Sequence, residues 1–291
     1  MNPAALIAWF DAHARDLPWR APGTTPWGVL VSEVMLQQTP VVRVTDVWTE
    51  WLARWPTPSS LAAEMPGTAV RAWGKLGYPR RALRLHATAT AIAARYDDAV
   101  PADVDMLLAL PGIGEYTARA VLAFGYGHRV PVVDTNVRRV VARAIHGMAD
   151  ARAPSTSRDL SDVDGILPDW WPPTRAARFC AALMELGAVV CTARRPRCAD
   201  CPVAGECAWV RAGRPAPAFP GRPTQRFAGT DRQVRGLLLD VLRTAAGPVP
   251  RARLNAVWPD APQRDRCLGS LIVDSLVERT SDGHFALPGE R

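Results

Sequence analysis

Four of the six cysteines in this chain lie close together, and this cluster constrains the fold more than any other feature of the sequence. The spacing is C-x6-C-x2-C-x5-C, formed by Cys191, Cys198, Cys201 and Cys207. Thiols at such spacing bind either a zinc ion or an iron–sulfur cluster. Zinc ribbons use two C-x2-C pairs, whereas this loop has one. We therefore favour a single 4Fe-4S cluster over zinc, and paired disulfides are the least favoured alternative.

The cysteines follow a long region that the hydrophobic pattern predicts to be almost wholly helical. Apolar residues recur at three- and four-residue intervals, and Pro and Gly interrupt the pattern. The expected helices span residues 4–13, 27–38, 41–54, 68–76, 81–95, 103–110, 115–124, 135–146 and 175–190. No apolar run approaches the roughly 18 residues of a membrane span, and the start of the chain has no basic leader. We therefore expect a mainly α, cytoplasmic protein.

Beyond residue 210 the composition changes. Arginine and proline are frequent and acidic residues are absent before three short helical patterns begin. Two short segments then flank Ser281-Asp282-Gly283, and an Asp-Gly turn in this setting predicts a β-hairpin. The sequence thus predicts a helical domain at 1–210 with its metal loop at 191–207, an extended basic Pro-rich linker at 211–230, and a small winged-helix-like α+β module at 231–291.

Two carboxylates have unusual surroundings. Glu33 is the only charged residue between Val29 and Thr39. On a helix its neighbours would be apolar, and desolvation would raise its pKa, as suits a general acid. The alternative is a glutamate at a groove edge with an ordinary pKa. Asp134 precedes an amphipathic helix and fits an N-cap, a role that is compatible with catalysis because it orients the carboxylate. Cleavage of a glycosidic bond requires both a proton donor and a negative charge.

A turn with two glycines separates two of the expected helices. Gly112 and Gly114 let the backbone turn tightly and expose N–H groups at the start of a helix. Such a turn either grips a DNA phosphate or is a plain connector.

These features together resemble one family. The cysteine spacing and the two-glycine turn resemble the cluster loop and the helix-hairpin-helix motif of the endonuclease III and MutY group of DNA glycosylases. Residues 32–39 resemble the signature of MutY-type adenine glycosylases, and residues 133–137 resemble the catalytic-aspartate segment of the group. The resemblance covers residues 1–210. It implies a two-lobed helix-hairpin-helix fold, a 4Fe-4S cluster, and base excision repair of double-stranded DNA in the nucleoid.

The resemblance also implies roles for single residues. Glu33 would protonate the target adenine at N7 and then activate water, and Asp134 would stabilise the cationic sugar. The other residues so implied are Asn136 and Tyr116 in assisting catalysis, Arg15, Trp19 and Glu185 in the adenine pocket, Gln38 and Tyr78 as wedges in the duplex, and Gly112 and Gly114 at the phosphate. Wedges fill the gap that a flipped base leaves. Core packing is the alternative for Trp19 and Tyr78. The implied substrate is adenine opposite 8-oxoguanine or guanine.

Two other functions remain open from the sequence. An endonuclease III-like glycosylase with AP lyase activity uses a lysine in the hairpin helix, where this chain has Tyr116. The only lysine present is Lys75. Because tyrosine forms no imine with a sugar, we expect a monofunctional glycosylase. A non-catalytic iron–sulfur DNA-binding regulator is the second alternative, since the C-terminal module is winged-helix-like.

The C-terminal module departs from the family. MutY-type enzymes carry a much larger Nudix-like domain that reads 8-oxoguanine, whereas residues 231–291 are too few for that fold and lack the Phe-Ser-His loop of the family. We expect this module to bind a repair protein, to touch flanking DNA or to stabilise the fold. We expect the enzyme to act as a monomer.

Overall fold

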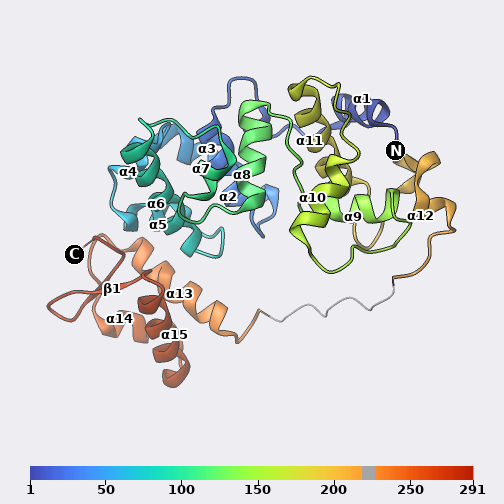
Figure 1. Ribbon diagram of the computed structural model, residues 1–291. Coiled ribbons are helices and arrows are strands. Elements are labelled where there is room, and N and C mark those ends of the chain that lie inside the picture. Colours follow the sequence, from blue (N-terminus) through green and yellow to red (C-terminus); the bar gives the residue numbers. More distant parts are fainter. Residues whose placement is uncertain (218–226, 291) are drawn as a thin grey trace. The chain divides into compact units, whose positions relative to one another are not determined.

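The computed structural model of the chain describes residues 1–217 and 227–290, which form two compact units (Figure 1). Unit 1 comprises Met1–Leu30, Ala102–Leu108 and the described residues from Gly114 to 217; unit 2 comprises Val31–Pro101, Ala109–Ile113 and the described residues from 227 to 290. The structure thus groups the C-terminal module with residues 31–101. The division at residues 210 and 230 stays a prediction, and residues 218–226 of the expected linker lie outside the described residues.

Unit 1 is helical and has one continuous core. Its elements are α1 (Pro3–His13), the 3-10 turn η1 (Pro18–Arg20), α7 (Val104–Leu108), α8 (Glu115–Ala120), the π turn η2 (Val121–Gly125), α9 (Thr135–Ala144), α10 (Thr156–Asp164), α11 (Pro173–Val189), the 3-10 turns η3 (Cys198–Asp200) and η4 (Ala204–Glu206), and α12 (Ala208–Arg211). The long helix α11 packs against both α1 and α9. Its Phe179 and Leu183 are fully buried there, so α11 is the helix around which this unit is built.

Unit 2 contains the remaining elements, and α2 (Pro26–Leu36) begins in unit 1 and ends in unit 2. The others are α3 (Val41–Arg54), α4 (Pro58–Ala62), α5 (Pro66–Trp73), α6 (Arg80–Arg95), α13 (Asp231–Thr244), α14 (Arg251–Asn255), α15 (Ala261–Val273), β1 (Glu278–Arg279) and β2 (Phe285–Ala286). Helices α4 and α5 pack against α6. Trp51 makes edge contacts with Trp55 and Trp73, with ring centroids 4.7 and 5.7 Å apart. These aromatic contacts fasten α3 to α5.

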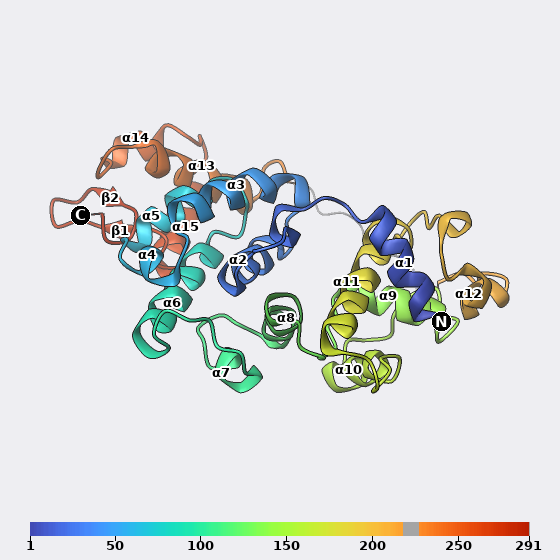
Figure 2. The same cartoon turned by 90° about the horizontal axis from the view of Figure 1, so that it is seen from above.

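The C-terminal module has the three helices and the hairpin that the sequence predicts (Figure 2). The strands β1 and β2 are antiparallel, with Arg279 opposite Phe285. The module is joined to α5 by close backbone contacts. Gly67 donates its N–H to the carbonyl of Pro288 at 2.8 Å, and a Cβ at position 67 would lie only 2.7 Å from that oxygen. Only glycine fits at this contact.

Arginines strengthen the same contact from both sides. Arg71 of α5 donates to the carbonyl oxygens of Leu242 (3.2 Å) and Ala245 (2.9 Å) and pairs with the carboxylate of Glu290. These carbonyls lie at the end of α13, where the helix leaves its own acceptors unsatisfied. In return, Arg243 of α13 donates to the carbonyl of Val70 at 3.1 Å. The C-terminal module is therefore part of the packing of unit 2.

Most expected helices are present, and the differences lie at their ends. The second helix stops at Leu36 instead of residue 38, and α5 stops at Trp73 instead of residue 76. Helices α4 and α10 were not expected, because the first is five residues long and the second is rich in Ser and Asp. The missed features are thus short or polar elements, whose apolar pattern is weak.

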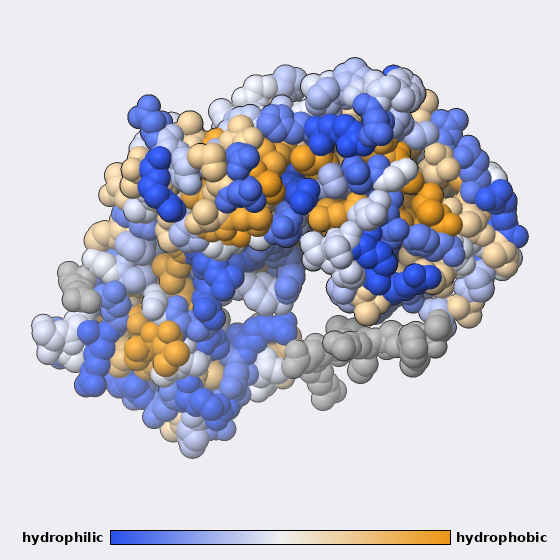
Figure 3. All heavy atoms as spheres, in the orientation of Figure 1, coloured by the Kyte–Doolittle hydropathy of each residue, from blue (hydrophilic) through white to orange (hydrophobic). Residues whose placement is uncertain are grey.

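The surface of the C-terminal module is largely hydrophilic. Figure 3 shows hydrophilic side chains around one apolar patch on the drawn face of this module. Exposed large apolar side chains include Val273 at the end of α15 (84%) and, in unit 1, Trp170 (78%). Among residues 1–217 and 227–290, no helix combines the length and apolar character that crossing a membrane requires.

Candidate active site

Glu33 lies on α2, near the end of the helix, and only 5% of it is exposed. Its helical neighbours Leu30 and Met35 are fully buried, and Glu33 is the only charged residue of α2. Burial among apolar side chains disfavours an ionised carboxylate and favours a proton donor. The sequence predicted such a desolvated position, and the burial of Glu33 agrees with it.

Asp134 is the N-cap of α9, as its position before an amphipathic helix predicts. Its Oδ1 accepts the backbone N–H of Val137 at 2.7 Å, and its Oδ2 accepts the side-chain amide of Asn136 at 2.8 Å. Burial raises the pKa of Asp134 above its ordinary value. The two hydrogen bonds and the charge of Arg139 act in the opposite direction, because they stabilise the ionised form. The carboxylate is thus held in one orientation in a desolvated place.

Asn136 connects Asp134 to the cysteine loop through Arg139. The guanidinium of Arg139 donates to Asn136 Oδ1, to the carbonyl of Gly187 and to the carbonyl of Cys191, each at 2.7 Å. A Cβ at Gly187 would lie 2.7 Å from the Cβ of Asn136, so glycine is needed for α9 and α11 to approach this closely. A continuous series of hydrogen bonds therefore joins the candidate catalytic carboxylate to the first cysteine.

The four predicted cysteine ligands line one hollow, together with Arg143 and Trp209. Arg143 Nη1 is 3.4 Å from the sulfur of Cys191 and donates to the carbonyl of Thr192 at 2.7 Å, while its guanidinium stacks on Trp209. Arg143 is 3% exposed, so a buried positive charge stands beside the thiols. This charge stabilises thiolates, which are the form that binds iron.

The thiols fit a bound metal cluster. Burial raises the pKa of Cys201 to about 11, and the charges of the other three cysteines act in the same direction. Four thiols that oppose one another's ionisation need a bound cation to be ionised together. Four cysteine thiolates are the ligand set of a 4Fe-4S cluster, and all four cysteines line this one hollow.

The residues predicted to form the adenine pocket include a dense ionic group. Glu185 of α11 is fully buried, and its carboxylate accepts Arg15 Nε (2.7 Å), Arg15 Nη2 (2.9 Å), the Arg15 backbone N–H (3.1 Å) and Arg20 Nη2 (2.9 Å). Desolvation alone would raise the pKa of Glu185, but the hydrogen bonds from Arg15 and the charge of Arg20 outweigh it and lower the pKa. Trp19 is buried on η1, directly before Arg20 in the chain.

The two predicted wedge residues share an unusual backbone conformation. Gln38 and Tyr78 are exposed and have φ values of +55° and +47°. Non-glycine residues in this left-handed region are uncommon and cluster at functional sites. Tyr78 is 50% exposed, so core packing, the alternative reading of this residue, does not describe it.

The glycine turn has the backbone that its sequence predicts. Gly112 has φ of +77°, and a Cβ there would lie 2.9 Å from the side chain of Arg84. Thr88 donates its hydroxyl to the carbonyl of Pro111 at 2.6 Å, which holds the turn against α6. Gly114 is the N-cap of α8, with open space where a Cβ would stand, and Tyr116 lies in the first turn of that helix.

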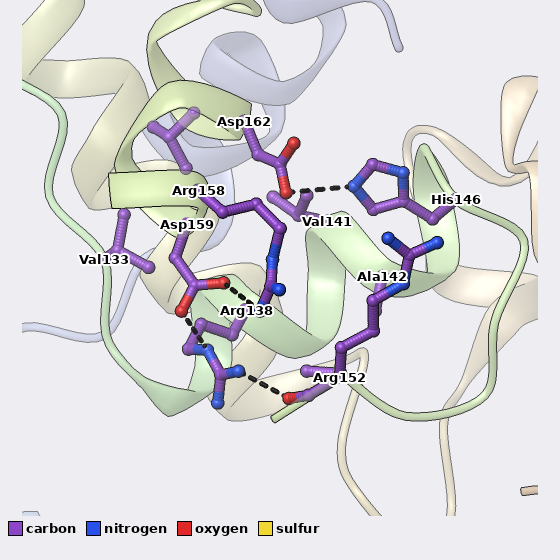
Figure 4. Close-up of a pocket in the computed structure, with 11 residues that line it drawn as sticks. Val133, Arg138, Val141, Ala142, His146, Arg152, Arg158, Asp159 and Asp162 are labelled. Carbon is purple, nitrogen blue, oxygen red and sulfur yellow. Dashed lines mark hydrogen bonds and ion pairs between the residues drawn. The ribbon is translucent and has the colours of Figure 1, made fainter. Parts of the chain in front are cut away.

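A further cleft of about 420 Å³ lies between α9 and α10 (Figure 4). Several of its charged side chains pair with one another: Arg138 donates to Asp159 at 2.8 Å, and His146 contacts Asp162 at 3.0 Å. None of the predicted site residues lines it. We assign this cleft to the packing of unit 1.

Sequence reasoning missed three arginines of the site: Arg20, Arg139 and Arg143. In sequence, the cluster Arg138, Arg139 and Arg143 is as typical of a solvated helix face as of a surface that neutralises phosphates. Instead, Arg139 and Arg143 point inward and satisfy backbone carbonyls. The available signal was spacing, because Arg139 and Arg143 lie four residues apart on α9 and therefore share one face of this helix.

Comparisons with known proteins agree with this geometry. The model of the HhH-GPD superfamily of base excision DNA repair proteins matches residues 31–163, and that of the iron–sulfur binding domain of endonuclease III matches residues 191–207. The chain is 61% identical over its whole length to an adenine DNA glycosylase of Mycolicibacterium smegmatis, covering 97% of that protein. It is 59% identical over 98% of its length to an adenine DNA glycosylase of Mycobacterium tuberculosis, covering 93% of that protein.

Among solved structures, a thermostable thymine-DNA glycosylase superimposes with a TM-score of 0.64, covering 72% of this chain and 95% of that one. Its sequence identity of 22% shows the common fold alone. Because the two mycobacterial proteins are matched over nearly their full lengths, the short C-terminal module is shared with them.

Proposed function

The chain belongs to the adenine DNA glycosylases of the HhH-GPD superfamily of base excision DNA repair proteins, and from this we propose that it hydrolyses the glycosidic bond of adenine mispaired with 8-oxoguanine or guanine in duplex DNA. It is a DNA N-glycosylase, a hydrolase, and an iron–sulfur protein. Its place of action is the DNA of the nucleoid, where it works as a monomer.

The observation that carries the proposed mechanism is the fixed, desolvated carboxylate of Asp134. When the bond to adenine breaks, positive charge develops on the sugar. A carboxylate held by Val137 N–H and Asn136 needs no reorganisation to stabilise that charge, and its burial strengthens the attraction. Asn136 and Tyr116 are the assisting residues in this proposal.

Glu33 is the proposed general acid. A departing adenine needs a proton at N7, and Glu33, which is 5% exposed on an otherwise uncharged helix, has the surroundings of a proton donor. After the base has left, the Glu33 carboxylate activates the attacking water. Glu33 thus acts first as an acid and then as a base, while Asp134 remains ionised and stabilises the sugar.

Recognition of the mispair is assigned to two groups of residues. Arg15, Trp19 and Glu185 form the pocket for the flipped adenine. Gln38 and Tyr78 enter the duplex where the adenine has left, and their exposure and left-handed backbone support this role. The glycine turn, Gly112 and Gly114, binds a phosphate of the same strand through backbone N–H groups.

The proposed reaction has no lyase step. Tyr116 stands in the first turn of the hairpin helix, where a lyase of this group has lysine. Lys75 is 84% exposed and pairs with Asp240 of α13 at 3.8 Å, so it retains the ordinary surroundings of a surface amine. Borohydride reduction should therefore trap little covalent complex with DNA. Trapping as strong as that of a true lyase would contradict a monofunctional reaction.

The cysteines Cys191, Cys198, Cys201 and Cys207 would hold the 4Fe-4S cluster. When bound, the cluster would link the four cysteines covalently and so hold the loop in one conformation. Arg139 and Arg143 bind the carbonyls around Cys191. They thereby connect the loop to α9, which carries Asp134.

A panel of duplexes tests the proposed substrate. Adenine is placed opposite 8-oxoguanine, guanine or cytosine, and released adenine is measured in a single turnover. We expect release from the first two duplexes and little from the third. Equal release from all three would refute recognition of the opposite base. Binding without any release would instead support the non-catalytic regulator.

A further inference from the structure

Arg81, near the start of α6, is a buried arginine that the proposed reaction does not use. It is 6% exposed, and among the described residues it makes no ion pair with a carboxylate. Desolvation by burial lowers its pKa to about 10. Burying a guanidinium costs free energy that hydrogen bonds must offset. Nη1 and Nη2 of Arg81 each have two acceptors, whereas its Nε is buried without a hydrogen-bond partner in the described part of the chain. The acceptors that Arg81 has found therefore indicate its role.

One side of the guanidinium binds the end of α2. Nη1 donates to the carbonyls of Val34 at 2.7 Å and Met35 at 2.9 Å. These carbonyls belong to the last turn of the helix, where no further helical N–H is available to them. They directly follow Glu33 in the chain. Arg81 thus fixes the end of the helix that carries the proposed acid.

The other side binds the two loops that carry the proposed wedge residues. Nη2 donates to the hydroxyl of Thr39 at 2.8 Å and to the carbonyl of Gly77 at 3.0 Å. Thr39 directly follows Gln38, and Gly77 directly precedes Tyr78. Thr39 in turn donates to the carbonyl of Leu76 at 3.1 Å, so the two loops are also joined to each other.

The guanidinium of Arg81 lies over two aromatic rings. Its central carbon lies 5.1 Å from the ring centroid of Trp73 and 5.6 Å from that of Tyr78. The indole of Trp73 donates to the carbonyl of Gly77 at 3.0 Å. Trp73 belongs to the core, and Tyr78 is the proposed wedge itself. Arg81 therefore contacts both the core beneath the Tyr78 loop and the side chain that enters the duplex.

We propose that Arg81, together with Thr39, is a positioning residue that locks the Glu33 helix and the Gln38 and Tyr78 loops into one block. When Gln38 and Tyr78 enter the duplex, the position of Glu33 relative to the DNA is then fixed at the same time. This inference rests on the proposed roles of Glu33, Gln38 and Tyr78. It adds that the three act as a unit because one guanidinium binds the backbone beside each of them.

Arginine is required for this role. Its planar fork reaches four acceptors and presents flat faces to two rings, whereas an ammonium is a compact charge with three donors. Arg81→Lys therefore keeps the charge but leaves acceptors unsatisfied and the Tyr78 ring without a stacking partner. A lysine in this place would leave the two loops free to move independently of α2.

The test compares Arg81→Lys with the wild type on a duplex with adenine opposite 8-oxoguanine. Three quantities are measured: adenine release per active site in a single turnover, the rise in fluorescence of 2-aminopurine beside the target base, and the affinity for an undamaged duplex. We expect release to fall by about 10- to 100-fold, as for misplaced catalytic groups. We expect the fluorescence rise to slow by a similar factor and the affinity to be unchanged.

Two substitutions of Thr39 test the same proposal with a smaller change, in case Arg81→Lys fails to fold. Thr39→Val removes the hydroxyl and should slow both release and base unstacking, whereas Thr39→Ser keeps the hydroxyl and should retain them. Arg95→Lys, at the exposed end of the same helix, is the control. If the wild type releases adenine and the Arg81 and Thr39 variants do so at the same rate, the inference is refuted. If the wild type releases none, the proposed function itself fails.

Discussion

Replacing Glu185 by glutamine removes the charge that Arg15 and Arg20 share. The carboxylate is fully buried, whereas the Arg15 and Arg20 side chains are 38% and 28% exposed. Breaking a buried pair costs about 3–5 kcal/mol. Both arginines keep part of their contact with water, and water screens the lost interaction. We therefore expect Glu185→Gln to lower the free energy of unfolding by about 2–3 kcal/mol.

For a chain of this size, that loss lowers the melting temperature by about 4–12 °C. The assay is thermal unfolding followed by circular dichroism at neutral pH. Glu64→Gln is the matched control, because Glu64 also binds an arginine, Arg54, but at the surface. Its loss should stay below about 1 kcal/mol.

The pH dependence gives a second check with a definite sign. The pKa of Glu185 is lowered in the folded protein, so its ionised form stabilises the fold. The advantage of the wild type over Glu185→Gln is complete above the ordinary glutamate pKa of about 4.3. It is lost as the pH falls through the folded pKa. Equal losses for Glu185→Gln and Glu64→Gln, or a difference that is constant with pH, would refute the reasoning.

Individual contacts predict the effects of four further substitutions. Burial raises the pKa of Asp134, so the folded protein loses stability as the pH rises from the unfolded to the folded pKa of this group. Asp134→Asn should therefore abolish adenine release without lowering the melting temperature at neutral pH. A lower melting temperature of Asp134→Asn would contradict this prediction. Gly67→Ala forces a Cβ to within 2.7 Å of the Pro288 carbonyl and should destabilise unit 2 by about 1–3 kcal/mol in urea unfolding. Gly236→Ala on α13, where a Cβ meets open space, should instead stabilise by about 0.5–1 kcal/mol. Arg143→Met should reduce the visible absorbance of the iron–sulfur cluster per chain, and a full cluster content would contradict the role of this charge beside Cys191.

The sequence predicted the features that depend on local pattern. Apolar periodicity located most helices, the spacing of the cysteines located the metal loop, and an aspartate before an amphipathic helix predicted the N-cap at Asp134. The ends of α2 and α5 were predicted too long. Arg81, which lies far away in the sequence, binds the carbonyls at the end of α2. The helix propensity of the local sequence cannot predict such a contact.

The direction in which arginines point was also beyond the sequence. Pairs such as Arg80-Arg81 and Arg138-Arg139 have the same composition as a surface that binds phosphate. In each pair at least one arginine turns inward and binds backbone carbonyls. Only the tertiary structure decides which one does so, because the acceptors come from other helices. The excess of arginine over lysine thus has a structural use, since the planar fork satisfies several carbonyls together.

In the proposed reaction, Glu33 donates the proton that releases adenine. The most direct measurement is single-turnover release of free adenine by Glu33→Gln and by the wild type, per active site, from a duplex with adenine opposite 8-oxoguanine. Glu50→Gln, an exposed glutamate on α3, is the control. We predict that Glu33→Gln binds the duplex and releases adenine at least about 100-fold more slowly, as expected when general acid catalysis is lost. Release by Glu33→Gln at the wild-type rate would contradict the account.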